Sequence, residues 1–176
     1  MPFFLFIGVL RYYKGLYTLI RAAQSVNVPI VIAGSGPEEQ ALHRFCDELG
    51  IQNVHFASQV TDAEKIALLK NCHTFVLPSH LRSEAFGMVL VEAAMLGKPL
   101  ISCEIGTGTS FVNQDKETGF VIPPEDPSAL AQSMNALLDN AALTERFGKA
   151  ARARYEQYFS GPALGQAYYD LYHQVQ

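Results

Sequence analysis

The sequence predicts a Rossmann-like α/β domain of three layers: about six parallel strands in one sheet, helices on both faces, and further helices at the C-terminal end. Strand-like apolar runs alternate with segments of helical periodicity along the first two thirds of the chain, which is typical of parallel sheets. The composition supports this prediction, because 176 residues that are 49% hydrophobic and 17% charged fit one domain with a sizeable core.

The elements follow in order. Residues 3–9 are almost continuously apolar, as expected of a strand covered on both faces, and residues 16–26 then have helical periodicity. The same criteria predict strands at residues 29–33, 54–57, 74–77, 100–103 and 119–122, and helices at residues 37–49, 62–71 and 86–96. Three more helices are predicted at residues 128–139, 143–158 and 163–175.

Composition excludes several classes of function. The net charge of −4 argues against nucleic-acid binding as the main activity, since that requires a basic surface. The three cysteines and five histidines show no ligand spacing, so neither a metal site nor a disulfide framework is predicted. The longest apolar stretches are strand-sized, and residues 1–8 lack the charged start of a signal peptide. We therefore expect a cytoplasmic protein without a membrane anchor.

Ligands of open parallel sheets bind beyond the carboxyl ends of the strands, so the loops that follow the strands come first. The loop of residues 10–15 carries Arg11 and Lys14, which suit phosphate oxygens, although they equally fit a solvated surface loop. The next loop contains Gly34 and Gly36, which let the backbone approach a ligand or simply turn. Pro37 is expected at the first position of the following helix.

The segment SEAFGMVLVEAAMLGKP, residues 83–99, places two acids in an apolar run. A helix that begins near Phe86 or Gly87 offers free N–H groups to an anion. Glu84 precedes this helix, so we expect it at the rim of the pocket. Glu92 lies inside the helix and needs hydrogen-bond donors, which a pair of ribose hydroxyls, a lysine, a backbone N–H or solvent could supply.

Two further loops are ambiguous. His80 lies just before Glu84, where it either touches a ligand or is an ordinary loop histidine. Residues 104–110 are rich in glycine and hydroxyl groups, which suit phosphate or sugar oxygens but also a turn and helix cap. The sequence contains no G-x-S-x-G nucleophile motif and no Asp-x-Asp pair. A bound diphosphate would therefore be balanced by Arg11, Lys14 and the helix N-terminus.

Taken together, these loops resemble the C-terminal domain of family 4 glycosyltransferases of the GT-B type, and the resemblance spans nearly the whole chain. It is carried by six motifs in order: Gly8 with Lys14-Gly15, AGSGP at residues 33–37, LPS at 77–79, EAFG at 84–87 with Glu92, GKP at 97–99, and ETGFV at 117–121.

The resemblance implies a donor-binding domain over residues 1–176 that holds a GDP- or UDP-linked sugar and uses no other cofactor. Lys14 would contact the diphosphate, Glu84 the transferred sugar and Glu92 the ribose, while backbone near Val60 would receive the base. The resemblance assigns the rest of the donor site to Gly8, Gly34, Gly36, His80, Phe86, Gly87, Met88 and Val89. Relatives usually have Arg directly after the first glycine, where this chain has Val9. Arg11 is our hypothesis for the replacement.

The resemblance also implies the reaction: retaining, metal-independent sugar transfer in bacterial surface polysaccharide or lipopolysaccharide synthesis, with mannosyl transfer as one candidate. An N-terminal acceptor domain would be missing from this chain, so we expect donor binding without transfer. That domain would bring a sugar or lipid-linked acceptor, and the full-length enzyme would associate peripherally with the inner face of the cytoplasmic membrane. The helix of residues 163–175 would cross back to that domain, leaving its aromatic residues partly exposed, unless they pack locally.

Two other functions remain open at this point. A noncatalytic module that binds a nucleotide or sugar phosphate would have the same fold. A dinucleotide-dependent oxidoreductase is disfavoured, because no glycine lies between Gly8 and Gly15.

Overall fold

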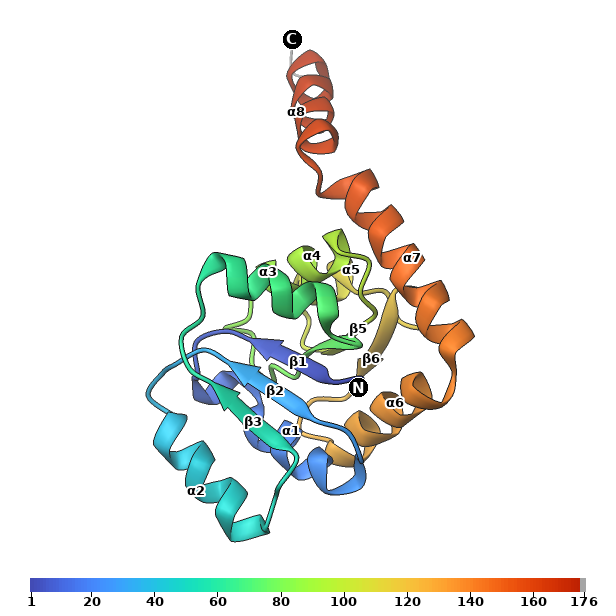
Figure 1. Cartoon of the computed structure of the whole chain (residues 1–176). Coiled ribbons are helices and arrows are strands. Elements are labelled where there is room, and N and C mark those ends of the chain that lie inside the picture. Colours follow the sequence, from blue (N-terminus) through green and yellow to red (C-terminus); the bar gives the residue numbers. More distant parts are fainter. Residues whose placement is uncertain (175–176) are drawn as a thin grey trace.

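A computed structural model describes residues 1–174 of the chain. In this range six parallel strands form one sheet in the order β3-β2-β1-β4-β5-β6 (Figure 1). The strands are β1 (Phe4–Ile7), β2 (Ile30–Ala33), β3 (Val54–Ala57), β4 (Thr74–Leu77), β5 (Leu100–Cys103) and β6 (Gly119–Ile122). The predicted Rossmann-like fold class is confirmed.

Helices cover both faces of the sheet (Figure 1). On one face lie α1 (Leu16–Ala22), α2 (Glu39–Leu49) and α6 (Pro127–Asp139). On the other lie α3 (Asp62–Asn71), α4 (Met88–Met95) and the short α5 (Thr109–Val112). Helix α7 (Ala141–Tyr158) packs against α4 beside β5 and β6, and α8 (Gly161–Gln174) leads away from the body of the domain.

The core follows from the apolar strands. All four residues of β1, β4 and β5 are buried, because helices cover both faces of these central strands. Phe4, Phe6 and Phe75 are fully buried and fill the space between the sheet and its helices. The edge strand β3 is only partly covered. This rigid sheet fixes the positions from which the functional loops emerge.

Most predicted elements have the observed bounds or differ by one to three residues. The predictions for β3, α3, β4, β5 and β6 match the structure residue for residue. The first strand is shorter than predicted, and residues 16–26 form α1 followed by a 3-10 turn, η2 (Ala23–Ser25). Residue 175 of the last predicted helix lies outside the described residues.

Two helices begin two residues later than predicted. Helix α2 begins at Glu39 rather than at residue 37, so Pro37 lies in the preceding turn and is not the first helical residue. Helix α4 begins at Met88, with Gly87 as its N-cap, rather than at residue 86. Two short elements were not predicted, the 3-10 turn η1 (Tyr12–Lys14) and α5. Among residues 1–174, no helix combines the length and the apolar character needed to cross a bilayer.

Candidate functional site

The candidate site lies at the carboxyl ends of β1 and β4, where the strand order reverses direction. Strand β1 pairs with β2 over four residue pairs but with β4 over only two, Phe4 with Thr74 and Leu5 with Phe75. The ladder between β1 and β4 therefore ends before the strands do, and their loops run toward opposite sides. This is the position at which open α/β sheets bind ligands.

A close backbone contact joins these two loops. Gly15 has a φ of +70°, and a Cβ atom there would lie 1.9 Å from the carbonyl oxygen of Pro78. The N–H of His80 donates to the carbonyl oxygen of Tyr13 at 3.0 Å. Only glycine combines the left-handed conformation with this approach, so Gly15 fixes the distance between the loops.

Lys14 and Glu84 form an ion pair across the loops, through Nζ and Oε2. The Ser79 hydroxyl donates to the same carboxylate oxygen at 3.0 Å. Glu84 is only 8% exposed, so the expectation that it lies at the rim is wrong. The acid is buried because a lysine and a hydroxyl compensate its charge. Ser79 was not predicted as a site residue, although it belongs to the LPS motif of residues 77–79.

The N-terminus of α4 follows Glu84 in the same loop. Gly87 caps the helix with a φ of +76°, and a Cβ atom there would lie 2.9 Å from Leu90 Cδ1 and 3.0 Å from Leu77 Cδ2. The N–H groups of Met88 and Val89 belong to the first turn and have no acceptor within the helix. Together with the helix dipole they make this end suitable for an anion.

Glu92 projects from α4 toward α3. Its Oε1 accepts a hydrogen bond from Lys65 Nζ at 3.0 Å. Its Oε2 is buried and has no hydrogen-bond partner among the described residues. Of the donors left open by the sequence, a lysine is therefore present, yet half of the carboxylate remains unused. No sequence pattern points to Lys65, because one lysine on a helix resembles any surface lysine.

The three predicted loop glycines serve loop packing. A Cβ atom at Gly34, where φ is +131°, would lie 2.0 Å from the carbonyl oxygen of Gly8. A Cβ atom at Gly36 would lie 2.5 Å from the carbonyl oxygen of Leu10. These contacts hold the loops after β1 and β2 together, and the N–H of Gly8 donates to Ala33. Of the two readings of this glycine turn, close backbone packing is the one these contacts support.

Val60 is half-buried in the loop between β3 and α3. It lines an apolar cavity of about 440 Å³ with Phe3, Ala57 and Leu68. Val60 immediately precedes the capping box of α3, in which the Thr61 side chain accepts from the N–H of Glu64. Its backbone therefore stands at a fixed position near Lys65.

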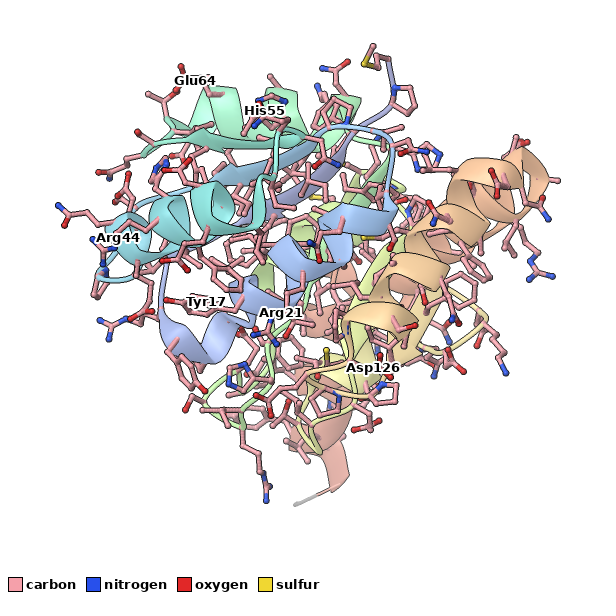
Figure 2. The ribbon with its side chains drawn as sticks, turned by 90° about the horizontal axis from the view of Figure 1, so that it is seen from below. Tyr17, Arg21, Arg44, His55, Glu64 and Asp126 are labelled. Carbon is pink, nitrogen blue, oxygen red and sulfur yellow. The ribbon has the colours of Figure 1, made fainter. Side chains whose placement is uncertain are left out.

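His80 is directed toward α1. Its ring packs edge-on against Tyr12, with centroids 4.9 Å apart, and both ring nitrogens are buried without a hydrogen-bond partner among the described residues. It lines a cavity of about 300 Å³ together with Tyr17 and Arg21 of α1, which Figure 2 labels. The structure thus places His80 between the two loops and α1.

Val9 and Arg11 are both exposed. Arg11 is the N-cap of η1 in extended conformation, and its carbonyl oxygen accepts from the N–H of Lys14. The hypothesis that Arg11 replaces the usual arginine stays a prediction.

The loop of residues 104–110 is an ordered turn. Hydrogen bonds from the Gly106 N–H and the Ser110 hydroxyl hold the pKa of Glu104 below its usual value. The N–H of Gly108 donates to the carbonyl oxygen of Ala85 at 2.9 Å. This loop therefore supports the segment that carries Glu84. Of the two interpretations of residues 104–110, these contacts favour a turn and helix cap.

Other reactive groups lie apart from this site. Burial raises the pKa of Cys46 to about 11 and those of Cys72 and Cys103 to about 12. No group of three or more His, Cys, Asp or Glu within residues 1–174 is arranged to hold a metal ion. A cavity of about 500 Å³ opens next to His73 and Lys98, which precede β4 and β5, at the opposite end of the sheet.

The sequence profile described as "Glycosyl transferases group 1" matches residues 1–154. The chain belongs to this family. Among curated proteins, the chain is 49% identical to O-antigen chain mannosyltransferase C of Escherichia coli, over 97% of this chain and 46% of that protein. It is 51% identical to D-rhamnosyltransferase WbpZ of Pseudomonas aeruginosa, over 90% of this chain and 42% of that protein. The chain therefore spans slightly less than half the length of these glycosyltransferases.

Solved glycosyltransferases of the GT-B type share the fold. Sucrose-phosphate synthase from Thermosynechococcus elongatus superposes with a TM-score of 0.88 at 28% identity, over 99% of this chain and 45% of that one. Anabaena HepE in complex with UDP superposes with a TM-score of 0.88 at 24% identity, over 98% of this chain and 48% of that one. A further HepE structure contains UDP-glucose.

Proposed function

We propose that this chain binds a nucleotide-diphosphate sugar and is the donor half of a retaining, metal-independent glycosyltransferase of bacterial surface polysaccharide synthesis. One observation carries the proposal. The Lys14–Glu84 pair joins the loops after β1 and β4, and the N-terminus of α4, with its free N–H groups, follows Glu84 in the second of these loops. This edge of the sheet thus combines a cation, a carboxylate and an anion-binding helix end.

The diphosphate occupies the space between Lys14 and the first turn of α4. The ammonium and the N–H groups of Phe86, Gly87, Met88 and Val89 surround its oxygens, and Arg11 adds charge from the loop surface. These groups stabilise the negative charge that develops on the leaving diphosphate as the sugar is transferred. Lys14 is then shared between Glu84 and the phosphate oxygens.

The two carboxylates hold the hydroxyl groups of the donor. Oε2 of Glu84 is engaged by Lys14 and Ser79, so Oε1 is the atom that accepts from the transferred sugar. Oε2 of Glu92 is buried and has no partner within residues 1–174, and a ribose hydroxyl satisfies it. The base lies against the backbone at Val60.

The named relatives support the substrate class. Two proteins at about half identity are an O-antigen mannosyltransferase and a D-rhamnosyltransferase. A GDP-linked mannose or 6-deoxyhexose is accordingly our first candidate, and a UDP-linked hexose is the second, because structural neighbours were solved with UDP and UDP-glucose.

Transfer itself requires a second domain that binds the acceptor. Because relatives are about twice as long, we propose that an N-terminal domain supplies a sugar or lipid-linked acceptor at the cytoplasmic face of the membrane. The present chain then binds donor without transferring it.

Calorimetric titration tests the proposal. GDP, UDP, GDP-mannose and UDP-glucose are titrated into the chain, and at least one is expected to bind. Lys14→Ala should weaken that binding by about tenfold to a hundredfold, since it removes a charge-assisted hydrogen bond. The matched control is Lys70→Ala, at an exposed lysine in the last turn of α3. Absence of binding by all four ligands at about 1 mM would refute the proposal.

A further inference from the structure

The ion pair between Lys65 and Glu92 leaves the carboxylate only half satisfied. Lys65 Nζ donates to Oε1 at 3.0 Å, whereas Oε2 is buried and has no partner among the described residues. A buried carboxylate oxygen without a partner is costly, because the oxygen has lost its water without gaining a donor. The arrangement therefore points to a donor that is brought by a ligand.

Lys65 pairs mainly with Glu92. Its other carboxylate neighbour, Asp62, lies at 3.9 Å and is almost fully exposed, while Glu92 lies at 3.0 Å and is about one third exposed. The closer and drier pair is the stronger one, because solvent screens the exposed partner.

The backbone that carries Lys65 is also fixed. The side chain of Glu64 accepts from the backbone N–H and the hydroxyl of Thr61, each at 2.8 Å. These bonds close the capping box at the start of α3 and hold the pKa of Glu64 below its usual value. Lys65 therefore reaches Glu92 from a helix turn that is held in place.

We infer that Lys65 is a positioning residue: it holds Oε1 of Glu92 so that Oε2 faces the ribose hydroxyls of the donor nucleotide. This inference rests on the proposed function and adds a property to it. Lys65 acts through Glu92 and sets the preference of the site for a ribonucleotide over its deoxy form. Without Lys65, the Glu92 carboxylate rotates freely and is no longer held in the orientation that accepts from the ribose hydroxyls.

The readout is a ratio of affinities. GDP and 2′-deoxy-GDP, and likewise UDP and 2′-deoxy-UDP, are titrated into the whole chain. The wild-type chain should bind the ribonucleotide about tenfold more tightly, because a hydrogen bond to a charged group is lost in the deoxy form. Lys65→Met should reduce this ratio to within about twofold of unity, and Lys65→Arg should restore most of it, since arginine also pairs with a carboxylate. Lys70→Met, on the same helix, should leave the ratio unchanged.

A second variant separates positioning from direct contact. Glu92→Gln should abolish the preference for the ribonucleotide, and Lys65→Met added to Glu92→Gln should change neither the ratio nor the affinity further. If Lys65→Met still lowers the affinity in the Glu92→Gln chain, Lys65 contacts the nucleotide itself and the inference is wrong. If Lys65→Met leaves the wild-type ratio intact, the inference also fails while the proposed function stands. If no nucleotide binds the wild-type chain, the proposed function fails, and the inference with it.

Discussion

Lys14 and Glu84 lie 70 positions apart in the sequence, yet their side chains meet in an ion pair that Ser79 completes. The two residues belong to loops after β1 and β4, the central strands of the sheet. The pair therefore links the two halves of the sheet at the point where the ladder between them ends.

Removing one partner of this pair should destabilise the protein. Lys14→Met leaves Glu84 buried beside a single hydroxyl donor, and we expect a loss of about 3 kcal/mol in the free energy of unfolding. The double variant Lys14→Met/Glu84→Gln should recover part of that loss, because no unpaired charge remains. Urea unfolding of both variants measures the difference. Equal stability of the single and double variants would contradict the assigned role of the pair.

Gly15 provides a second prediction. Gly15→Ala combines an unfavourable φ of +70° with a clash against Pro78, so we expect a loss of more than about 2 kcal/mol in unfolding free energy, together with weaker nucleotide binding. Gly50→Ala is the matched control, since its φ is +65° and nothing lies within 4 Å of the added carbon. The control should cost only about 1 kcal/mol. Similar losses at both positions would mean that the contact with Pro78 is unimportant.

Tyr17 makes stability depend on high pH. Burial and a hydrogen bond to Glu38 raise the pKa of Tyr17 from 10.0 to about 12. The unfolded chain therefore loses this proton at a lower pH than the folded chain, and the contribution is present below about pH 10 and lost as the pH rises toward 12. Tyr17→Phe should show a shallower loss of stability between pH 9.5 and 11.5, measured by denaturant unfolding. The raised thiol pKa values of the three cysteines act in the same direction in both chains and cancel in the comparison. Parallel curves would contradict the prediction.

A variant of Arg11 tests whether this residue replaces the arginine that relatives usually have at the position of Val9. If Arg11 supplies the charge that Val9 lacks, Arg11→Ala should weaken nucleotide-diphosphate binding by about threefold to tenfold, less than Lys14→Ala, because Arg11 is more exposed. The same titrations measure both variants. Unchanged affinity in Arg11→Ala, with binding abolished in Lys14→Ala, would disprove the substitution.

Local signals explain why much of the fold was predictable. Helix α3 has a Thr-Asp-Ala-Glu capping box at its start, and the apolar runs of β4 and β5 are bounded by polar or turn residues. Helix α2 starts two residues late because Glu38 donates its backbone N–H to the carbonyl oxygen of Leu10, a contact between loops that no local pattern encodes.

Part of the candidate site could be predicted from motifs. Glu84, Glu92 and Lys14 belong to motifs that carry the family resemblance. Lys65, the partner of Glu92, could not be predicted in this way, because which lysine reaches a carboxylate depends on how α3 packs beside α4. The burial of Glu84 likewise depends on Ser79 and Lys14, which only the folded chain brings together.

The short ladder between β1 and β4 would give the proposed donor a mechanical role. With only two residue pairs joining the half-sheets β3-β2-β1 and β4-β5-β6, their carboxyl ends are held largely by contacts between loops. A donor that bridges Lys14 and α4, as proposed, would act as a non-covalent cross-link between these half-sheets. Occupancy of the proposed donor site would then slow the opening motions that expose the amides of the central strands to solvent hydrogen exchange.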